Sequence, residues 1–126
     1  MYKKTLPPLS PEFCSLKEMF MKPQFIIGAA SSGSGKTTFT MGLLRALAHR
    51  GMRVQPYKCG PDYIDTQFHS LASKQVSVNL DTWLASEEHV RSLYHSYGKD
   101  ADVCTVEGVM GLYDGYSGMK GSSAAM

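Results

Sequence analysis

The sequence of 126 residues lacks several features that mark particular classes of protein. No uncharged apolar run approaches the roughly 20 residues that a membrane-spanning helix needs, so we expect no membrane association. Thirteen Lys and Arg against eleven Asp and Glu give a net charge of only +2, and no basic stripe stands out, which argues against a nucleic-acid partner. The three cysteines, Cys14, Cys59 and Cys104, form no CxxC pair, which favours reduced thiols and a cytoplasmic protein over a disulfide or zinc framework.

The clearest motif is an apolar run that turns through small residues into a glycine, a lysine and a threonine. It extends from Phe25 to Thr38 and matches the pattern GxxxxGK[ST], except that Ala30 stands where the first glycine belongs. Small residues let successive backbone N–H groups converge on phosphate oxygens, and the helix that follows directs its positive end to the same anion. We therefore predict that the phosphates of ATP bind at Ser32, Gly33, Ser34, Gly35, Lys36, Thr37 and Thr38. Lys36 is expected on the outer phosphates and the Thr37 hydroxyl on Mg²⁺; a Gly/Ser-rich loop with a chance lysine is the alternative.

Apolar patterns along the rest of the chain predict strands that alternate with helices. Strands are expected at about residues 24–28, 53–58 and 102–106, and helices at about residues 35–50 and 86–98. This order implies a parallel sheet with helices on both faces, so the predicted fold class is α/β, of the Rossmann-like P-loop NTPase type. In such folds ligands bind at the carboxyl ends of the strands.

Burial is expected to follow the apolar side chains. Residues 25–27 are apolar throughout and predict a first strand that is buried on both faces. Phe39 is expected on the inward side of the first helix, and Trp83 in the core or at an interface. None of the four histidines has the spacing of a metal ligand, including His69 near a pair of aspartates.

The two ends of the chain lead to further expectations. Residues 1–22 contain three prolines, which break regular elements, and we expect a poorly ordered extension there. Residues 107–120 are rich in glycine and are expected to form a loop, and residues 121–126 to begin a helix. Since a sheet of three strands leaves an open edge, we expect the fold to be incomplete at the C-terminus and the chain to associate through that edge.

Charged side chains follow the predicted strands at the edge where a ligand would bind. Glu107 ends the last strand and could hold Mg²⁺ directly or through water; an exposed strand-end carboxylate is the alternative. Asp62 and Asp65 follow the second strand, and a turn in which an aspartate caps a helix is an equal alternative for them. Lys58 closes a buried strand, where a cation requires an anion such as a phosphate. Asp114, taken alone, is most simply a turn residue.

Four segments, taken together, resemble the cobyrinate a,c-diamide synthases, from about Phe25 to the C-terminus. The phosphate loop is shared with many ATPases, whereas KxGPDYID and EGVMGLxDG are far more specific. The four segments are Gly28 to Thr38, Gln55 to Asp65, Asn79 to Asp81, and Val106 to Gly115. The departure at Ala30 is typical of the wider group of P-loop amidoligases, which includes dethiobiotin synthetase and cobyric acid synthase.

The resemblance implies an ATP-dependent ligase of corrinoid biosynthesis. ATP would phosphorylate the a and c carboxylates of cobyrinate in turn, and ammonia would displace the phosphate to leave an amide. The ammonia would come from glutamine, hydrolysed in a C-terminal glutaminase domain for which 126 residues leave no room. Residues 23–126 are therefore expected to be the N-terminal portion of the synthetase domain, and to be inactive alone.

The resemblance also implies roles for individual residues. The expected catalytic residues are Lys36, Lys58, Asp62, Asp65 and Asp114, and the expected metal ligands are Thr37, Glu107 and Asp62. The separate roles of the three aspartates are left open. A regulatory ATP-binding switch of the partitioning-ATPase type is the competing interpretation, and an inert fragment is a third.

Overall fold

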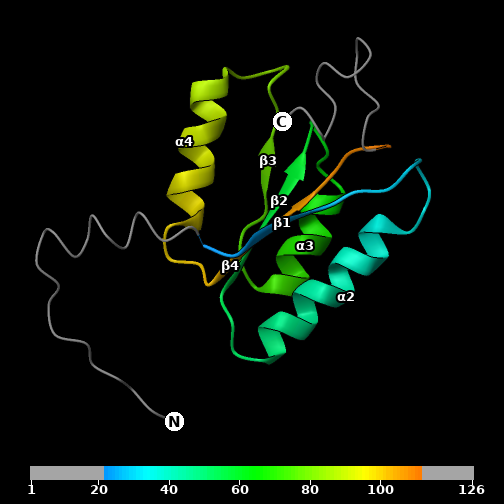
Figure 1. The fold of residues 1–126 in the computed structure, drawn as a ribbon, viewed down its shortest axis with the longest axis vertical. Helices are drawn as coiled ribbons and strands as arrows, with labels where there is room; N and C mark the ends of the chain where they lie inside the picture. Colours follow the sequence, from blue (N-terminus) through cyan, green and yellow to red (C-terminus); the bar gives the residue numbers. More distant parts are fainter. Residues whose placement is uncertain (1–21, 112–126) are drawn as a thin grey trace, which may run out of the picture.

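The fold is a parallel sheet of four strands, seen in a computed structural model that describes residues 22–111 (Figure 1). The elements in chain order are β1 (Gln24–Ile27), α2 (Lys36–His49), β2 (Val54–Cys59), α3 (Asp65–Ser73), β3 (Val78–Leu80), α4 (Glu87–Gly98) and β4 (Val103–Glu107). The parallel α/β arrangement predicted from the sequence is thereby confirmed. No helix in this part of the chain is long and apolar enough to span a membrane.

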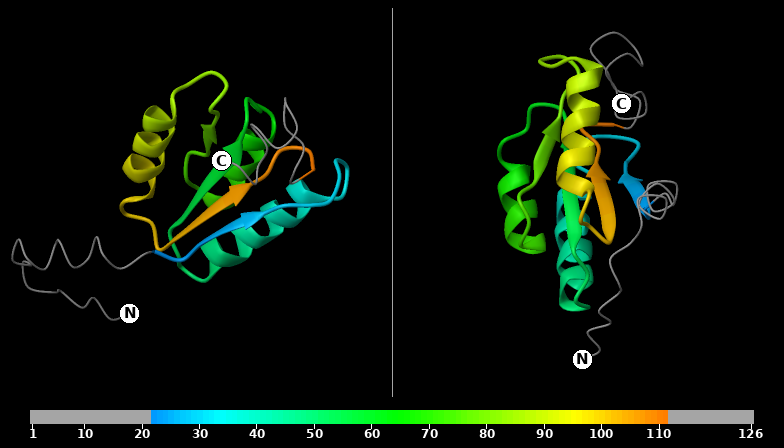
Figure 2. Two further views of the ribbon diagram at one scale, coloured as in Figure 1. Left: turned by 45° about the horizontal axis from the view of Figure 1, so that its top comes forward. Right: turned by 90° about the vertical axis from the view of Figure 1, so that its left-hand side faces the viewer.

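The strand order is β1-β4-β2-β3, so the last strand in the sequence lies between the first two. The chain crosses from β1 to β2 and on to β3 through α2 and α3, then returns to β4 through α4. Because crossovers between parallel strands are right-handed, the return in the opposite direction places α4 on the other face of the sheet. Figure 2 shows α4 separated from α2 and α3 by the strands. The expectation of helices on both faces is therefore correct.

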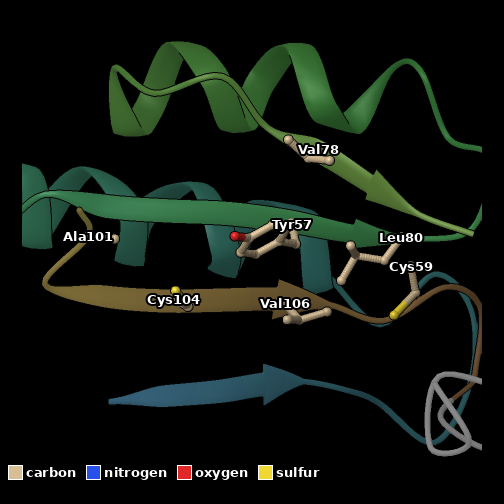
Figure 3. Packing of buried hydrophobic residues seen from close by; sticks show 7 residues of the cluster. All are labelled: Tyr57, Cys59, Val78, Leu80, Ala101, Cys104 and Val106. Carbon is tan, nitrogen blue, oxygen red and sulfur yellow. The ribbon is translucent and has the colours of Figure 1, made fainter. Parts of the chain in front are cut away.

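Two apolar layers follow from this arrangement. On one face Val54 and Val103 of the sheet pack with Leu44 of α2 and Ala72 of α3. The other layer faces α4 and consists of Tyr57, Cys59, Val78, Leu80, Ala101, Cys104 and Val106, shown in Figure 3. Since side chains alternate along a strand, the residues between these apolar positions face the α2 and α3 side, and at the strand ends they are charged.

The prediction of three strands was wrong, because the expected long connection after β2 contains both α3 and β3. The strand β3 has only three residues, which is too short to show a period of two. The helix α3 has the sequence DTQFHSLAS, with few apolar residues to mark an inward face.

Two expectations about burial were also wrong. Phe25 and Ile26 are 37% and 53% exposed, because β1 pairs only with β4 among the described strands and lies at the edge of the sheet. On α2 the buried residues include Thr40 and Leu44, and Phe39 is turned outward and 62% exposed. Trp83, expected in the core or at an interface, is 66% exposed and so does not belong to the core. Residues 1–21 and 112–126, with the expected extension, Asp114 and the last helix, lie outside the described residues.

Candidate nucleotide-binding site

The predicted phosphate loop connects β1 to α2, and its backbone has the conformation that an anion cradle requires. Gly33 and Gly35 have φ values of 76° and 85°, in the left-handed region that side chains other than glycine rarely adopt. The helix α2 begins at Lys36, directly after this turn, and its first free N–H groups face the loop. The loop therefore combines convergent donors, a helix N-terminus and a lysine at one place.

A pocket of about 380 Å³ lies against the loop. Its lining contains all the predicted phosphate-binding residues together with side chains from the ends of β2 and β4 and from the start of α3: Ser32, Gly33, Ser34, Gly35, Lys36, Thr37, Thr38, Lys58, Asp62, Asp65, Glu107, Val109 and Met110. The fold thus brings together every predicted site residue that it describes. The individual roles of these residues remain predictions.

Lys58 is at the centre of the charged part of this site. It is only 3% exposed, and parallel pairing of β2 with β4 places it opposite Glu107. Its Nζ lies 3.2 Å from Oε1 of Glu107, 3.2 Å from Oδ2 of Asp65 and 3.9 Å from Oδ2 of Asp62. It also donates a hydrogen bond to the carbonyl oxygen of Gly108, at 2.9 Å. One buried cation is therefore shared by three carboxylates, as the burial of a charge requires.

Oxygen donors suitable for a hard cation meet beside Lys58. The Thr37 hydroxyl oxygen lies 2.9 Å from Oε1 of Glu107 and 3.2 Å from Oδ2 of Asp65, and its one proton can be donated to only one of them. Such a set of one hydroxyl and two carboxylates fits Mg²⁺, which also keeps several waters and binds nucleotide phosphates. In the described part of the chain no group of three His, Cys, Asp or Glu could hold a metal ion by itself. A cation here would therefore depend on water and phosphate oxygens for much of its coordination.

Asp62 makes contacts of two kinds, one with the start of α3 and one with Lys58. Its Oδ1 accepts hydrogen bonds from the backbone N–H groups of Ile64 and Asp65, each at 3.0 Å, and so supports the start of α3. Its Oδ2 faces Lys58. Because the same carboxylate holds the helix and faces the cation, the position of Asp65 in the pocket depends on Asp62.

Lys36 reaches across the mouth of the pocket. Its Nζ donates a hydrogen bond of 2.5 Å to the carbonyl oxygen of Met110, in the loop that follows β4. Met110 has a φ of 50°, which is uncommon for a residue other than glycine. Within residues 22–111, the lysine of the phosphate loop therefore donates to one backbone carbonyl on the far side of the pocket, and that acceptor is uncharged.

The sequence did not predict a role for His69, which is fully buried in α3. Its Nε2 lies 2.5 Å from Oε2 of Glu107, and Ser77 Oγ lies 3.5 Å from its Nδ1. His69 follows Asp65 by four residues, so the two share one face of α3. That spacing would have indicated His69 if α3 had been recognised as a helix.

In the sequence, Asn79 is notable only as part of the segment from Asn79 to Asp81. In the structure, its side chain also supports the site. With its amide oriented so that the nitrogen donates, it bonds the carbonyl oxygens of Asp62 at 2.9 Å and Gly60 at 3.2 Å. Gly60 has a φ of 80°, which the turn after β2 requires. The side chain from β3 therefore holds the loop that carries the aspartates.

Two carboxylates of the site, Glu107 and Asp62, have pKa values that are lowered in spite of their burial. Burial raises the pKa of Glu107, but the hydrogen bond from His69, the charge of Lys58 and the hydrogen bond from Thr37 outweigh it and hold the pKa below its ordinary value. Burial also raises the pKa of Asp62, and the N–H groups of α3 together with Lys58 lower it by more. Negative charge is therefore maintained at the place where a cation would bind.

Comparison with known proteins agrees with this geometry. The CbiA family, described as the CobQ/CobB/MinD/ParA nucleotide binding domain, has a model that matches residues 25–125. The chain belongs to this family. Membership confirms the P-loop nucleotide-binding fold class that the sequence predicted, and the matched segment contains the whole pocket.

Individual curated proteins are also similar in sequence. The chain is 50% identical over 93 residues to the cobyrinate a,c-diamide synthase of Listeria monocytogenes serotype 4b, covering 73% of this chain and 21% of the relative. It is 52% identical over 90 residues to the protein of that name from Picrophilus torridus, covering 71% and 20%. It is 51% identical over 96 residues to the hydrogenobyrinate a,c-diamide synthase of Streptomyces coelicolor, covering 76% and 20%. The chain thus spans about a fifth of the length of the curated relatives it matches, and the resemblance noted in the sequence is confirmed.

Proposed function

We propose that this chain carries the ATP- and Mg²⁺-binding part of a ligase that amidates the a and c carboxylates of cobyrinate. The observation that carries the proposal is the Lys58 cluster: a buried lysine shared by Asp62, Asp65 and Glu107, beside the phosphate loop. The segments that supply these side chains are the ones that resemble the diamide synthases most specifically. The names of the relatives support the same substrate.

The reaction we propose has two steps. An oxygen of the substrate carboxylate attacks the γ-phosphorus of ATP, and ADP leaves with the electron pair of the broken P–O bond. Ammonia then attacks the acyl carbon of the acyl phosphate, phosphate leaves, and the nitrogen loses a proton to give the amide. We further propose that the ammonia is released from glutamine by a glutaminase domain outside these residues. We place the reaction in the cytoplasm.

In this reaction the residues of the chain position and stabilise the phosphates. The N–H groups of the loop and the Lys36 ammonium bind the triphosphate, and Lys36 exchanges the Met110 carbonyl for a phosphate oxygen. Lys58 stabilises the charge that moves to the bridging oxygen as the P–O bond breaks. Thr37, Glu107 and the aspartates would hold Mg²⁺, which supplies further charge neutralisation at the phosphates.

Nucleotide binding is tested by titration of the chain with a non-hydrolysable ATP analogue and Mg²⁺. We expect the wild-type chain to bind, and Lys36→Ala to weaken the affinity at least tenfold, because it removes the one lysine of the loop. Lys99→Ala is the matched control, since Lys99 is an exposed lysine at the end of α4. Equal affinity of Lys36→Ala and Lys99→Ala would refute the assignment of the pocket.

The substrate is tested separately, in a chimera in which residues 22–111 replace the matching segment of the Listeria synthase. With cobyrinate, ATP, Mg²⁺ and an ammonium salt, we expect ADP release that depends on the corrinoid and yields the diamide. ADP release that is indifferent to cobyrinate would favour the regulatory switch instead.

A further inference from the structure

His69 is a buried polar side chain that forms a hydrogen bond with the carboxylate of Glu107. It has no exposed surface, and it lies on α3 rather than on the phosphate loop or a strand end. A buried imidazole must satisfy its ring nitrogens, and Nε2 does so with one oxygen of Glu107, at 2.5 Å. Because a carboxylate only accepts hydrogen bonds, Nε2 carries the proton and donates it.

This hydrogen bond separates the two oxygens of Glu107. Oε2 is held by His69, and Oε1 faces the Thr37 hydroxyl at 2.9 Å and the Lys58 ammonium at 3.2 Å. The carboxylate is therefore fixed at both ends, with Oε1 on the side of the phosphate pocket. Without a donor at Oε2, the carboxylate would be held through Oε1 alone by Thr37 and Lys58, and its second oxygen could take other orientations.

We propose that His69 is a positioning residue for Glu107: it binds Oε2 so that Oε1 is directed toward the metal and phosphate side of the pocket. The inference rests on the proposed binding of ATP and Mg²⁺ at this site. His69 does not contact the pocket itself, since it is absent from the pocket lining. Its effect is therefore indirect, through the orientation of one carboxylate, as is common for residues that hold metal ligands from behind.

The packing of α3 supports a fixed orientation of His69. Ser77 Oγ approaches Nδ1 at 3.5 Å, so the second ring nitrogen also faces a polar group. The Ser73 hydroxyl donates to the carbonyl oxygen of His69 at 2.8 Å. Each ring nitrogen thus faces a polar atom, and Ser73 supports the backbone of His69. We expect a replacement that keeps a donor near Nε2 to preserve the effect on Glu107.

The test compares two variants that differ in this donor. His69→Leu keeps much of the volume and removes the hydrogen bond, whereas His69→Gln keeps an N–H donor of similar reach without an ionisable ring. The affinity for a non-hydrolysable ATP analogue is measured by calorimetry with Mg²⁺ and again with EDTA. His49→Leu is the matched control, because His49 is exposed at the end of α2, away from the pocket.

We expect His69→Leu to reduce the Mg²⁺-dependent gain in affinity by about 10- to 100-fold, the usual cost of removing such a support. The affinity in EDTA should change less than twofold, and His69→Gln should retain the gain within about threefold of wild type. If His69→Leu does not fold by circular dichroism, His69→Asn is used, since its amide is too short to reach Glu107.

Four results would overturn the inference. A full Mg²⁺-dependent gain in His69→Leu or His69→Asn would show that Glu107 needs no such support. Equal losses in His69→Gln and His69→Leu, or equal losses with Mg²⁺ and with EDTA, would show a general effect on packing. Absence of Mg²⁺-dependent binding in the wild-type chain would instead refute the proposed function, and the inference with it.

Discussion

Lys58→Met is the substitution that tests the buried charge cluster most directly. Methionine keeps the apolar stem and removes the cation that the three carboxylates share. Removing one partner of a buried ion pair costs about 3–5 kcal/mol of unfolding free energy, because the other charge stays buried without compensation. We expect about 3 kcal/mol, the low end, because Glu107 keeps its hydrogen bonds with His69 and Thr37, and Asp65 is 21% exposed and can be solvated.

This cost is large against a total stability of about 5–15 kcal/mol for a typical domain. It should also depend on pH. Because the pKa of Glu107 is held below its ordinary value, the stabilisation by Lys58 is complete above about pH 4.5 and is lost as the pH falls through the pKa in the folded state. The difference between Lys58→Met and wild type should therefore be greatest near neutral pH and should shrink in acid.

The assay is equilibrium unfolding in urea, followed by circular dichroism at pH 7, 5 and 3.5. Lys99→Met makes the same chemical change at an exposed position, and we expect it to alter the stability by less than about 0.5 kcal/mol. The reasoning would be refuted if Lys58→Met were as stable as Lys99→Met at pH 7. A loss of stability of the same size at every pH would also refute it, because it would indicate packing rather than charge.

Three further predictions concern stability. Gly98→Ala should cost about 1–3 kcal/mol in urea unfolding, because its Cβ would lie 2.9 Å from the hydroxyl oxygen of Tyr57 and 3.1 Å from the sulfur of Cys104; Gly42→Ala, with open space at its Cβ, is the control. Ser86→Ala removes the hydroxyl that caps α4 and should cost about 1 kcal/mol, whereas Ser86→Asp, which keeps an acceptor, should cost little. The urea midpoint of the wild-type chain should fall as the pH drops below about 4. The pKa values of Glu107 and Asp62 are lowered in the folded state, so these groups stabilise the fold only while they are ionised. A midpoint that is constant down to about pH 3 would contradict this.

The sequence predicted the parts of the site that are local in the chain. The phosphate loop could be recognised because its glycines, lysine and threonine are adjacent and have one physical purpose. Lys58 and Glu107 could be placed at strand ends, because each closes a strand that the sequence predicts. Their direct contact could not be predicted, because it requires β4 to lie beside β2. The order of strands in a sheet does not follow from local sequence patterns.

The missing elements were those with weak local patterns. With α3 and β3 unrecognised, His69 had no helix face to share with Asp65, and Asn79 had no strand to carry it to the aspartate loop. The errors at Phe25 and Phe39 have a related cause. An apolar side chain indicates burial only if something covers it, and that depends on tertiary position: β1 is at the edge of the described sheet, and α2 is rotated so that Thr40 faces inward.

The central position of β4 also determines when the site can exist during folding. β1 has no partner among the described strands until residues 103–107 arrive, because β4 is the strand that joins it to β2. A pairing between distant parts of the chain is slow to form, because the loss of chain entropy on closing the loop precedes any stabilising contact. Glu107 is the last residue of that same strand. On a growing chain the strand that joins β1 to β2 and the carboxylate that completes the charge cluster therefore arrive together, and a β2–β3 pair formed earlier would not present a finished pocket to a nucleotide.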